Sequence, residues 1–194
     1  WTADNAASLN IKFVTHLGDL VNHAATASEW NNAHSAMATL DNAGMPYGTC
    51  VGNHDILYPG DYYDPAGVNY LGKFSPAKYA GKPWFGGASP SGLSNYQIIS
   101  VNGREFLFLH LLIETPPQEL AWAQEILNAN QEKATWVSTH RYLFDWMVLG
   151  AGRYDEFNYT FEAPYRHDGI PADTFFHNFV APNRQIYMVY CGHN

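Results

Sequence analysis

Charged side chains are scarce in this sequence. Asp, Glu, Lys and Arg together make up 14% of the 194 residues, against ~25% in an ordinary soluble protein. The Lys and Arg residues form no cluster, and the formal net charge is −8. A basic surface for nucleic acid or for an anionic membrane is therefore not predicted. An anionic small molecule would need a local positive centre, because the overall field repels it.

Long apolar runs and cysteines are also few. No run approaches the ~20 apolar residues of a transmembrane helix, so no membrane span is predicted. No signal peptide is visible, and because the first residue is Trp1 rather than a methionine we expect the N-terminus to be processed or cut. Cys50 and Cys191 do not make a disulfide framework. Each is expected to be a small buried residue, and a single disulfide is the alternative.

Apolar and aromatic residues, in contrast, are plentiful. The chain is 46% hydrophobic and 15% aromatic, so it is expected to fold as one domain over residues 1–194. Its many Trp, Tyr and Asn residues and its few lysines favour a periplasmic or extracellular location. The oligomeric state has no signal in the sequence.

The first half of the chain predicts a strand, a helix and a second strand. Residues 11–17 read as a buried strand, residues 24–42 as a helix, and residues 47–51 as another short strand. A helix that connects two strands favours parallel pairing. Residues 57–94 are rich in Gly, Pro, Tyr and Ser without a sustained period, and they predict a long surface excursion.

The second half begins with a hairpin signal. The dipeptide Asn102-Gly103 separates two strand-like runs. The remaining predicted elements are, in chain order, a helix that starts at Thr115-Pro116-Pro117, a strand over 134–139, an aromatic loop over 154–169, a short helix over 172–180 and a last strand over 184–192.

Four predicted strands end in polar residues that bind metals or protons. Asp19 follows the first strand, Asn53 and His54 follow the second, and His140 and His193 follow two later ones. In α/β architectures, ligands gather beyond the carboxyl ends of strands. Asp, Asn and two His suit Zn, Mn or Fe rather than a soft thiolate site. A single Gly-Asp after a strand is usually just a turn, but four such strand ends in one chain predict a metal site.

These residues resemble the ordered motif blocks of the calcineurin-like metallophosphoesterases. The blocks are Gly18-Asp19, the run Gly52-Asn53-His54-Asp55, His140, and Gly192-His193. The segment LLIETPPQELAWAQEIL also looks like the strand-to-helix segment of secreted or periplasmic-type bacterial members. The resemblance implies an α/β (α+β) fold of four layers, a two-sheet β-sandwich flanked by helices, with a dinuclear metal site at the carboxyl ends of strands. It also implies hydrolysis of phosphate mono- or diesters, small-molecule substrates, by a metal-activated bridging hydroxide.

The resemblance assigns a role to each matching residue. The implied metal ligands are Asp19, which would bridge both ions, and Asn53, His140 and His193, which would complete the shell of the second ion. His54 would contact the phosphate or protonate the leaving oxygen. Asp55 would orient and polarise His54, as carboxylates do for catalytic imidazoles.

Two blocks of the family pattern are missing. No Asp-x-His or Asp-x-Gln block stands on the opening strand, and the final Gly-His-x-His stops at Asn194. We therefore expect a domain that is incomplete at both ends. Two divalent or trivalent ions (Mn, Zn or Fe) are expected in the complete protein, and one at best in this chain. The alternative function is a non-catalytic binding or assembly module of the same fold that has lost one metal.

Other polar residues leave alternatives open. Arg141 could contact a phosphate through its planar fork or be a solvated surface arginine. Asn22 and Tyr58 are further candidate substrate-binding residues, although Tyr58 could equally pack its loop against the body. Glu114 lines the cleft or caps the next helix. The remaining histidines are expected to be structural rather than ligands: His16, His23, His34, His110, His167 and His177.

Overall fold

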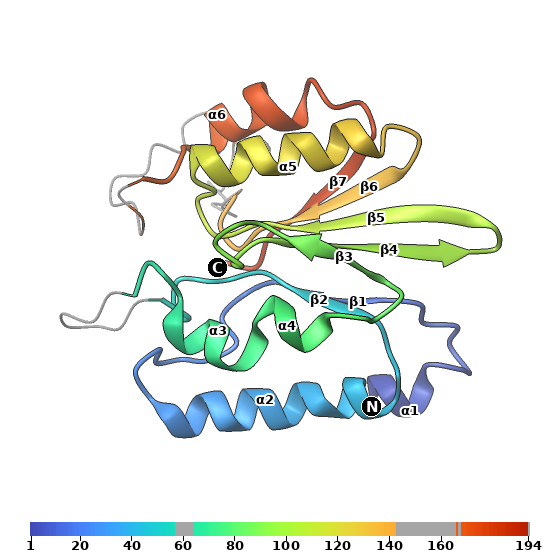
Figure 1. The fold of residues 1–194 in the computed structure, drawn as a ribbon, viewed down its shortest axis with the longest axis vertical. Coiled ribbons are helices and arrows are strands. Elements are labelled where there is room, and N and C mark those ends of the chain that lie inside the picture. Colours follow the sequence, from blue (N-terminus) through green and yellow to red (C-terminus); the bar gives the residue numbers. More distant parts are fainter. Residues whose placement is uncertain (57–63, 143–165, 167, 194) are drawn as a thin grey trace, which may run out of the picture.

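The computed structural model describes residues 1–56, 64–142, 166 and 168–193 (Figure 1). The described strands are β1 (Val14–His16), β2 (Tyr47–Thr49), β3 (Phe85–Ala88), β4 (Asn95–Val101), β5 (Arg104–His110), β6 (Ala134–Ser138) and β7 (Ile186–Tyr190). The described helices are α1 (Thr2–Asn5), α2 (Ala27–Asn42), α3 (Val68–Phe74), α4 (Pro76–Tyr79), α5 (Pro117–Ala129), α6 (Ala172–Phe175) and the π-helical turn η1 (Phe176–Val180).

The strands form two sheets that lie between two layers of helices. One sheet pairs β1 with β2, and the other has the order β3-β4-β5-β6-β7. Helices α1 to α4 lie on the outer side of the small sheet, and α5 and α6 cover the outer side of the large sheet (Figure 1). The predicted four-layer fold, a two-sheet sandwich flanked by helices, is thus confirmed.

The strand directions bring several carboxyl ends to one edge of the sandwich. β1 and β2 run parallel, as do β5, β6 and β7, whereas β3 and β4 are antiparallel to their neighbours. The predicted hairpin between β4 and β5 is confirmed. Its two turn residues, Asn102 and Gly103, both have positive φ, as a two-residue turn that matches the strand twist requires.

The prediction of a long surface excursion over residues 57–94 is wrong for the part that the structure describes. That part contains α3, α4 and β3. Tyr70, Phe74 and Tyr79 are buried and pack beside Trp30 of α2 and Tyr47 of β2. Burial of a large aromatic ring stabilises a fold by roughly 2 kcal/mol, so these side chains outweigh the Gly and Pro residues that suggested a loop.

Other predicted elements appear with shorter or shifted bounds. The first predicted strand is shortened at both ends to β1, and the predicted helix over 24–42 begins later, at Ala27 of α2, but ends at Asn42 as predicted. The helix α1 was not predicted, and the residues predicted as a short helix after Pro171 form α6 and η1. Cys50 and Cys191 form no disulfide, so the disulfide alternative is wrong, and Cys50 is buried as expected. Most of the predicted aromatic loop at 154–169 lies outside the described residues. Within the described part of the chain, every helix is too short or too polar to span a membrane.

Candidate metal centre

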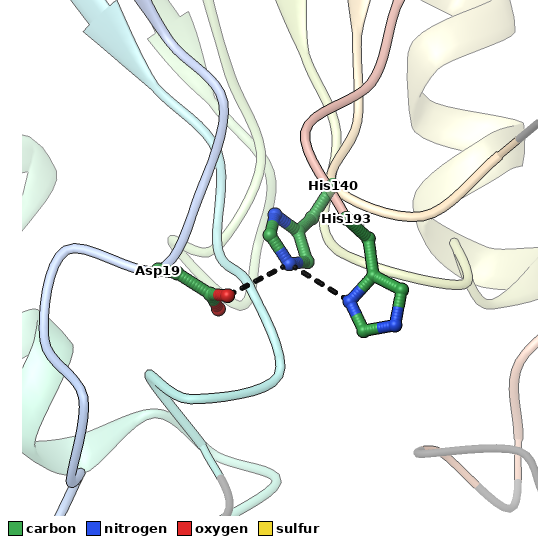
Figure 2. Close-up of side chains that lie close together, drawn as sticks. All are labelled: Asp19, His140 and His193. Carbon is green, nitrogen blue, oxygen red and sulfur yellow. Dashed lines mark hydrogen bonds and ion pairs between the residues drawn. The ribbon is translucent and has the colours of Figure 1, made fainter. Parts of the chain in front are cut away.

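The predicted ligands meet at the carboxyl edge of the two sheets. Asp19 and Asn53 come from the loops that follow β1 and β2, and His140 and His193 come from the loops that follow β6 and β7. Figure 2 shows the Asp19 carboxylate facing the two histidine rings across the gap between these loops. Each sheet therefore supplies half of the site.

Two glycines allow the loops to approach closely. Gly18 has φ +93°, and a Cβ there would lie 2.6 Å from Nδ1 of His140. A Cβ on Gly52 would lie 2.2 Å from Oδ1 of Asp19. Asp19 itself has φ +53°, an uncommon conformation for a residue other than glycine. The backbone is thus held in a conformation that costs of the order of 1 kcal/mol and that directs the carboxylate into the cleft.

His140 is the centre of the group. It is 2% exposed. Its Nδ1 lies 2.6 Å from the Leu17 carbonyl oxygen, which can only accept, so Nδ1 carries a proton and Nε2 is directed at the other ligands. Nε2 lies 3.1 Å from Oδ2 of Asp19, 3.1 Å from Oδ1 of Asn53 and 3.2 Å from Nδ1 of His193.

The electrostatics of this group favour a cation at its centre. Burial alone would lower the pKa of His140, but the contact with Asp19 and its charge outweigh burial, and the pKa is raised. Burial alone would raise the pKa of Asp19, but the His140 ring and the backbone N–H of His54 lower it overall. The pKa of His193 is lowered, first by burial and then by the charges of His140 and Arg141. The carboxylate is thus ionised and attracts a positive charge, either a proton on Nε2 or a metal ion.

The donor atoms suit one metal ion. The potential ligand atoms of Asp19, His140 and His193 all lie within 4.8 Å of one another, and the Asn53 oxygen adjoins them. Ligands ~2.1 Å from a common ion are ~3.0–3.4 Å apart, which agrees with the three separations at Nε2 of His140. Among the described residues, no second group of His, Cys, Asp and Glu side chains converges in this way.

Asp55 does not make the contact that the resemblance implied. It is fully buried, and its two oxygens accept hydrogen bonds from the backbone N–H groups of Gly52, at 2.8 Å, and Val21, at 3.2 Å. Burial raises the pKa of Asp55 to about 7. The His54 ring instead lies with Nδ1 2.8 Å from the Asn22 carbonyl oxygen. Asp55 therefore joins the two ligand loops, and a backbone carbonyl orients His54.

A pocket of about 390 Å³ opens beside Asp19 and His54. Asn22 lines it, as do Glu29 and Asn32 from α2. Glu29 accepts hydrogen bonds at 2.8 Å from the backbone N–H groups of both Asn22 and His23, and its other oxygen lies 2.7 Å from Nδ1 of His23. The contact with His23 and these backbone groups lowers the pKa of Glu29, so it is ionised near neutral pH.

Arg141 is held rather than solvated. Its guanidinium Nη1 lies 2.5 Å from Oε1 of Glu114, and the arginine side chain is only 12% exposed. The other Glu114 oxygen accepts the backbone N–H of Arg166 at 2.8 Å. Glu114 therefore pairs with Arg141 next to the cleft instead of capping α5, whose N-cap residue is Pro116. Tyr58 lies outside the described residues, so its role stays a prediction.

Glu29 is the residue near the site that sequence reasoning missed. The run Thr26-Ala27-Ser28-Glu29 has the form of a capping box, in which the glutamate would accept the N–H of the N-cap residue. In the structure that N–H donates to the His23 carbonyl instead. A glutamate in the first helical turn directly after a ligand loop was the available signal.

Two comparisons with known proteins agree with this geometry. The family model for calcineurin-like phosphoesterases matches residues 2–194. The chain is also 30% identical over 193 residues to the uncharacterized protein YvnB of Bacillus subtilis (strain 168). The alignment covers 100% of this chain but 13% of that relative, so the chain spans a small part of the relative's length.

Proposed function

Because this chain belongs to the calcineurin-like phosphoesterase family, we propose that it catalyses metal-dependent hydrolysis of phosphate monoesters or diesters. The observation that carries the proposal is the convergence of Asp19, Asn53 and His193 on Nε2 of His140. An acidic chain with a net charge of −8 gives a phosphate no long-range attraction. A cation held by these ligands would supply the local positive charge.

Each residue of the site would have a role that follows from its position. Asp19, Asn53, His140 and His193 would hold the ion, and a bound divalent ion offsets phosphate charge and lowers the pKa of water. His54 lines the pocket beside Asp19, where it can contact the phosphate or protonate the leaving oxygen. Glu114 orients the Arg141 guanidinium, which would add a planar pair of donors for phosphate oxygens.

The test uses the protein at its full natural length. Hydrolysis of p-nitrophenyl phosphate and bis-p-nitrophenyl phosphate is measured with Mn, Zn or Fe, and bound metal is counted by elemental analysis. We expect turnover with at least one metal, and loss of ~10²-fold or more in kcat for an alkyl phosphate ester in His54→Ala with metal content unchanged, because an alkoxide leaving group needs a proton. Absence of turnover with every metal, or an unaltered rate for the alkyl ester in His54→Ala, would contradict the proposal and favour a binding module.

A further inference from the structure

A single peptide unit lies between a carboxylate and the His54 ring. The N–H of His23 donates to Oε2 of Glu29 at 2.8 Å, and the carbonyl of Asn22, in the same peptide unit, accepts from Nδ1 of His54 at 2.8 Å. The path thus runs from the Glu29 carboxylate through one amide to the imidazole. Neither Glu29 nor this amide belongs to the predicted metal ligands.

We propose that Glu29 is the positioning residue for His54, acting through the Asn22–His23 peptide unit. The inference rests on the proposed function only for what His54 does to the substrate. A carboxylate that accepts from one end of an amide polarises the amide and strengthens the hydrogen bond at its other end. The Asn22 carbonyl therefore becomes a better acceptor for the His54 Nδ1–H than an isolated carbonyl would be.

The same contacts select the tautomer of His54. A carbonyl oxygen cannot donate, so Nδ1 of His54 must carry the proton. Nε2 has no hydrogen-bond partner within the described part of the chain, and the residue lines the pocket next to Asp19. The ring thus presents one defined nitrogen to a bound ester, which is the role that a carboxylate usually plays for a catalytic histidine.

The other contacts of Glu29 fit positioning better than helix capping. It sits at the third position of α2, yet it bonds to none of the backbone N–H groups of its own helix and reaches Asn22 and His23 in the loop that follows Asp19. Its second oxygen, Oε1, accepts from Nδ1 of His23, which fixes the carboxylate plane. Three short hydrogen bonds therefore hold a two-residue segment whose carbonyl supports His54.

The first experiment reads the His54 tautomer directly. Imidazole ¹⁵N shifts are recorded by NMR on the zinc-loaded full-length protein, with His54 assigned from His54→Ala. We expect the Nδ1–H tautomer of His54 in the wild type and a mixture of tautomers in Glu29→Gln. The glutamine side chain carries no negative charge, and it cannot accept hydrogen bonds from both the backbone N–H and Nδ1 of His23. Glu125→Gln, the same change at an exposed position of α5, is the matched control and should match the wild type.

The second experiment varies the leaving group. A p-nitrophenolate leaves without help from an acid, whereas an alkoxide needs a proton. In Glu29→Gln we expect kcat for an alkyl phosphate ester to fall ~10–100-fold, kcat for the p-nitrophenyl ester to fall less than ~3-fold, and KM to change little for either. Glu125→Gln should change neither rate by more than ~2-fold.

The outcomes separate the two proposals. An Nε2–H tautomer of His54 in the wild type would overturn the proposed positioning role of Glu29. This measurement needs no variant, so it decides the question even if Glu29→Gln fails to fold. A folded Glu29→Gln with wild-type tautomer and wild-type leaving-group dependence would also overturn it. A wild type that hydrolyses no ester would overturn the proposed function, and the tautomer measurement would still decide the role of Glu29.

Discussion

The molecule contains two pairs of buried or half-buried histidines with opposite surroundings. His140 and His193 share Asp19 and lie at the edge of the sandwich. His16 and His110 lie between the two sheets, where a Cβ on Gly48 of β2 would touch the His110 ring at 2.3 Å. Both nitrogens of His110 and Nδ1 of His16 lack a hydrogen-bond partner within the part of the chain that the structure describes.

The two histidine pairs differ in whether they lie within the hydrogen-bonded strands or just beyond the strand ends. His16 is paired with Thr49, and His110 with Asn95 and Ser138, so both remain inside the sheets. His140 and His193 come after the last paired residues of β6 and β7. A histidine within a ladder meets the side chains of the opposite sheet, whereas one just beyond it meets the loops of neighbouring strands. The comparison teaches that the strand end, rather than the histidine itself, predicts a ligand.

Removal of the carboxylate from the edge cluster should have the largest effect. Asp19→Asn keeps the shape but leaves Nε2 of His140 without its ionic partner, 3.1 Å away. We expect bound metal to fall below one per chain and kcat/KM to drop by at least ~10²-fold. Elemental analysis and steady-state kinetics measure both. His110→Leu, in the interior pair, should retain the metal, and loss of metal from that variant would undo the comparison.

Crowding of the ligand loops should have the next largest effect. In Gly52→Ala the new Cβ would lie 2.2 Å from Oδ1 and 2.4 Å from the backbone N of Asp19, so the loop must shift. We expect metal affinity to fall ~10-fold or more and unfolding free energy to fall by ~1–3 kcal/mol. Calorimetric titration and urea unfolding report these values. Gly72→Ala, where nothing lies within 4 Å of the new Cβ, is the matched control and should bind metal normally.

The interior histidine His110 should make the free energy of unfolding fall as the pH is lowered. Burial lowers the pKa of His110 to about 3, below the ~6.5 of an unfolded histidine. The unfolded chain therefore takes up the proton first as the pH falls, so this contribution to stability is present above pH ~6.5 and is lost between pH ~6.5 and ~3. Between pH 7 and pH 5 the loss is ~2 kcal/mol.

His110→Leu should flatten that part of the pH dependence. Urea unfolding of wild type and variant at pH 7 and pH 5 isolates the contribution, because every other titrating group is common to both. An equal pH slope in the two proteins would show that His110 accepts a proton in the folded state, and the contrast between the pairs would then fail.

The strand-end residues were predictable because their signal is local. Asp19, Asn53, His140 and His193 each follow a short apolar run, and parallel strands must bring such ends together. The fold class followed from the same alternation of strands and helices. Residues 68–88 were not predictable in this way, because their Gly and Pro content hides the aromatic contacts across the chain that determine their structure.

The partner of His54 could not be read from the sequence for a different reason. Asp55 is adjacent in the chain and Glu29 is 25 residues away, so proximity in sequence pointed to Asp55, whereas the His54 ring contacts the Asn22 carbonyl oxygen. This contact depends on the path of the loop after Asp19, which brings the Asn22 carbonyl oxygen to Nδ1 of His54 and the N–H of the same peptide unit to Glu29. Hydrogen bonds to backbone groups in loops leave no pattern of residue types behind.

The division of the ligands between the two sheets has a mechanical consequence. Asp19 and Asn53 follow strands of the small sheet, and His140 and His193 follow strands of the large one. An ion bound by all four is a cross-link between the layers of the sandwich, and separation of the layers must release it. Its binding energy would therefore add to the free energy of unfolding as RT ln(1 + [M]/Kd), so a chelator would lower the melting temperature, and that temperature would report the metal affinity.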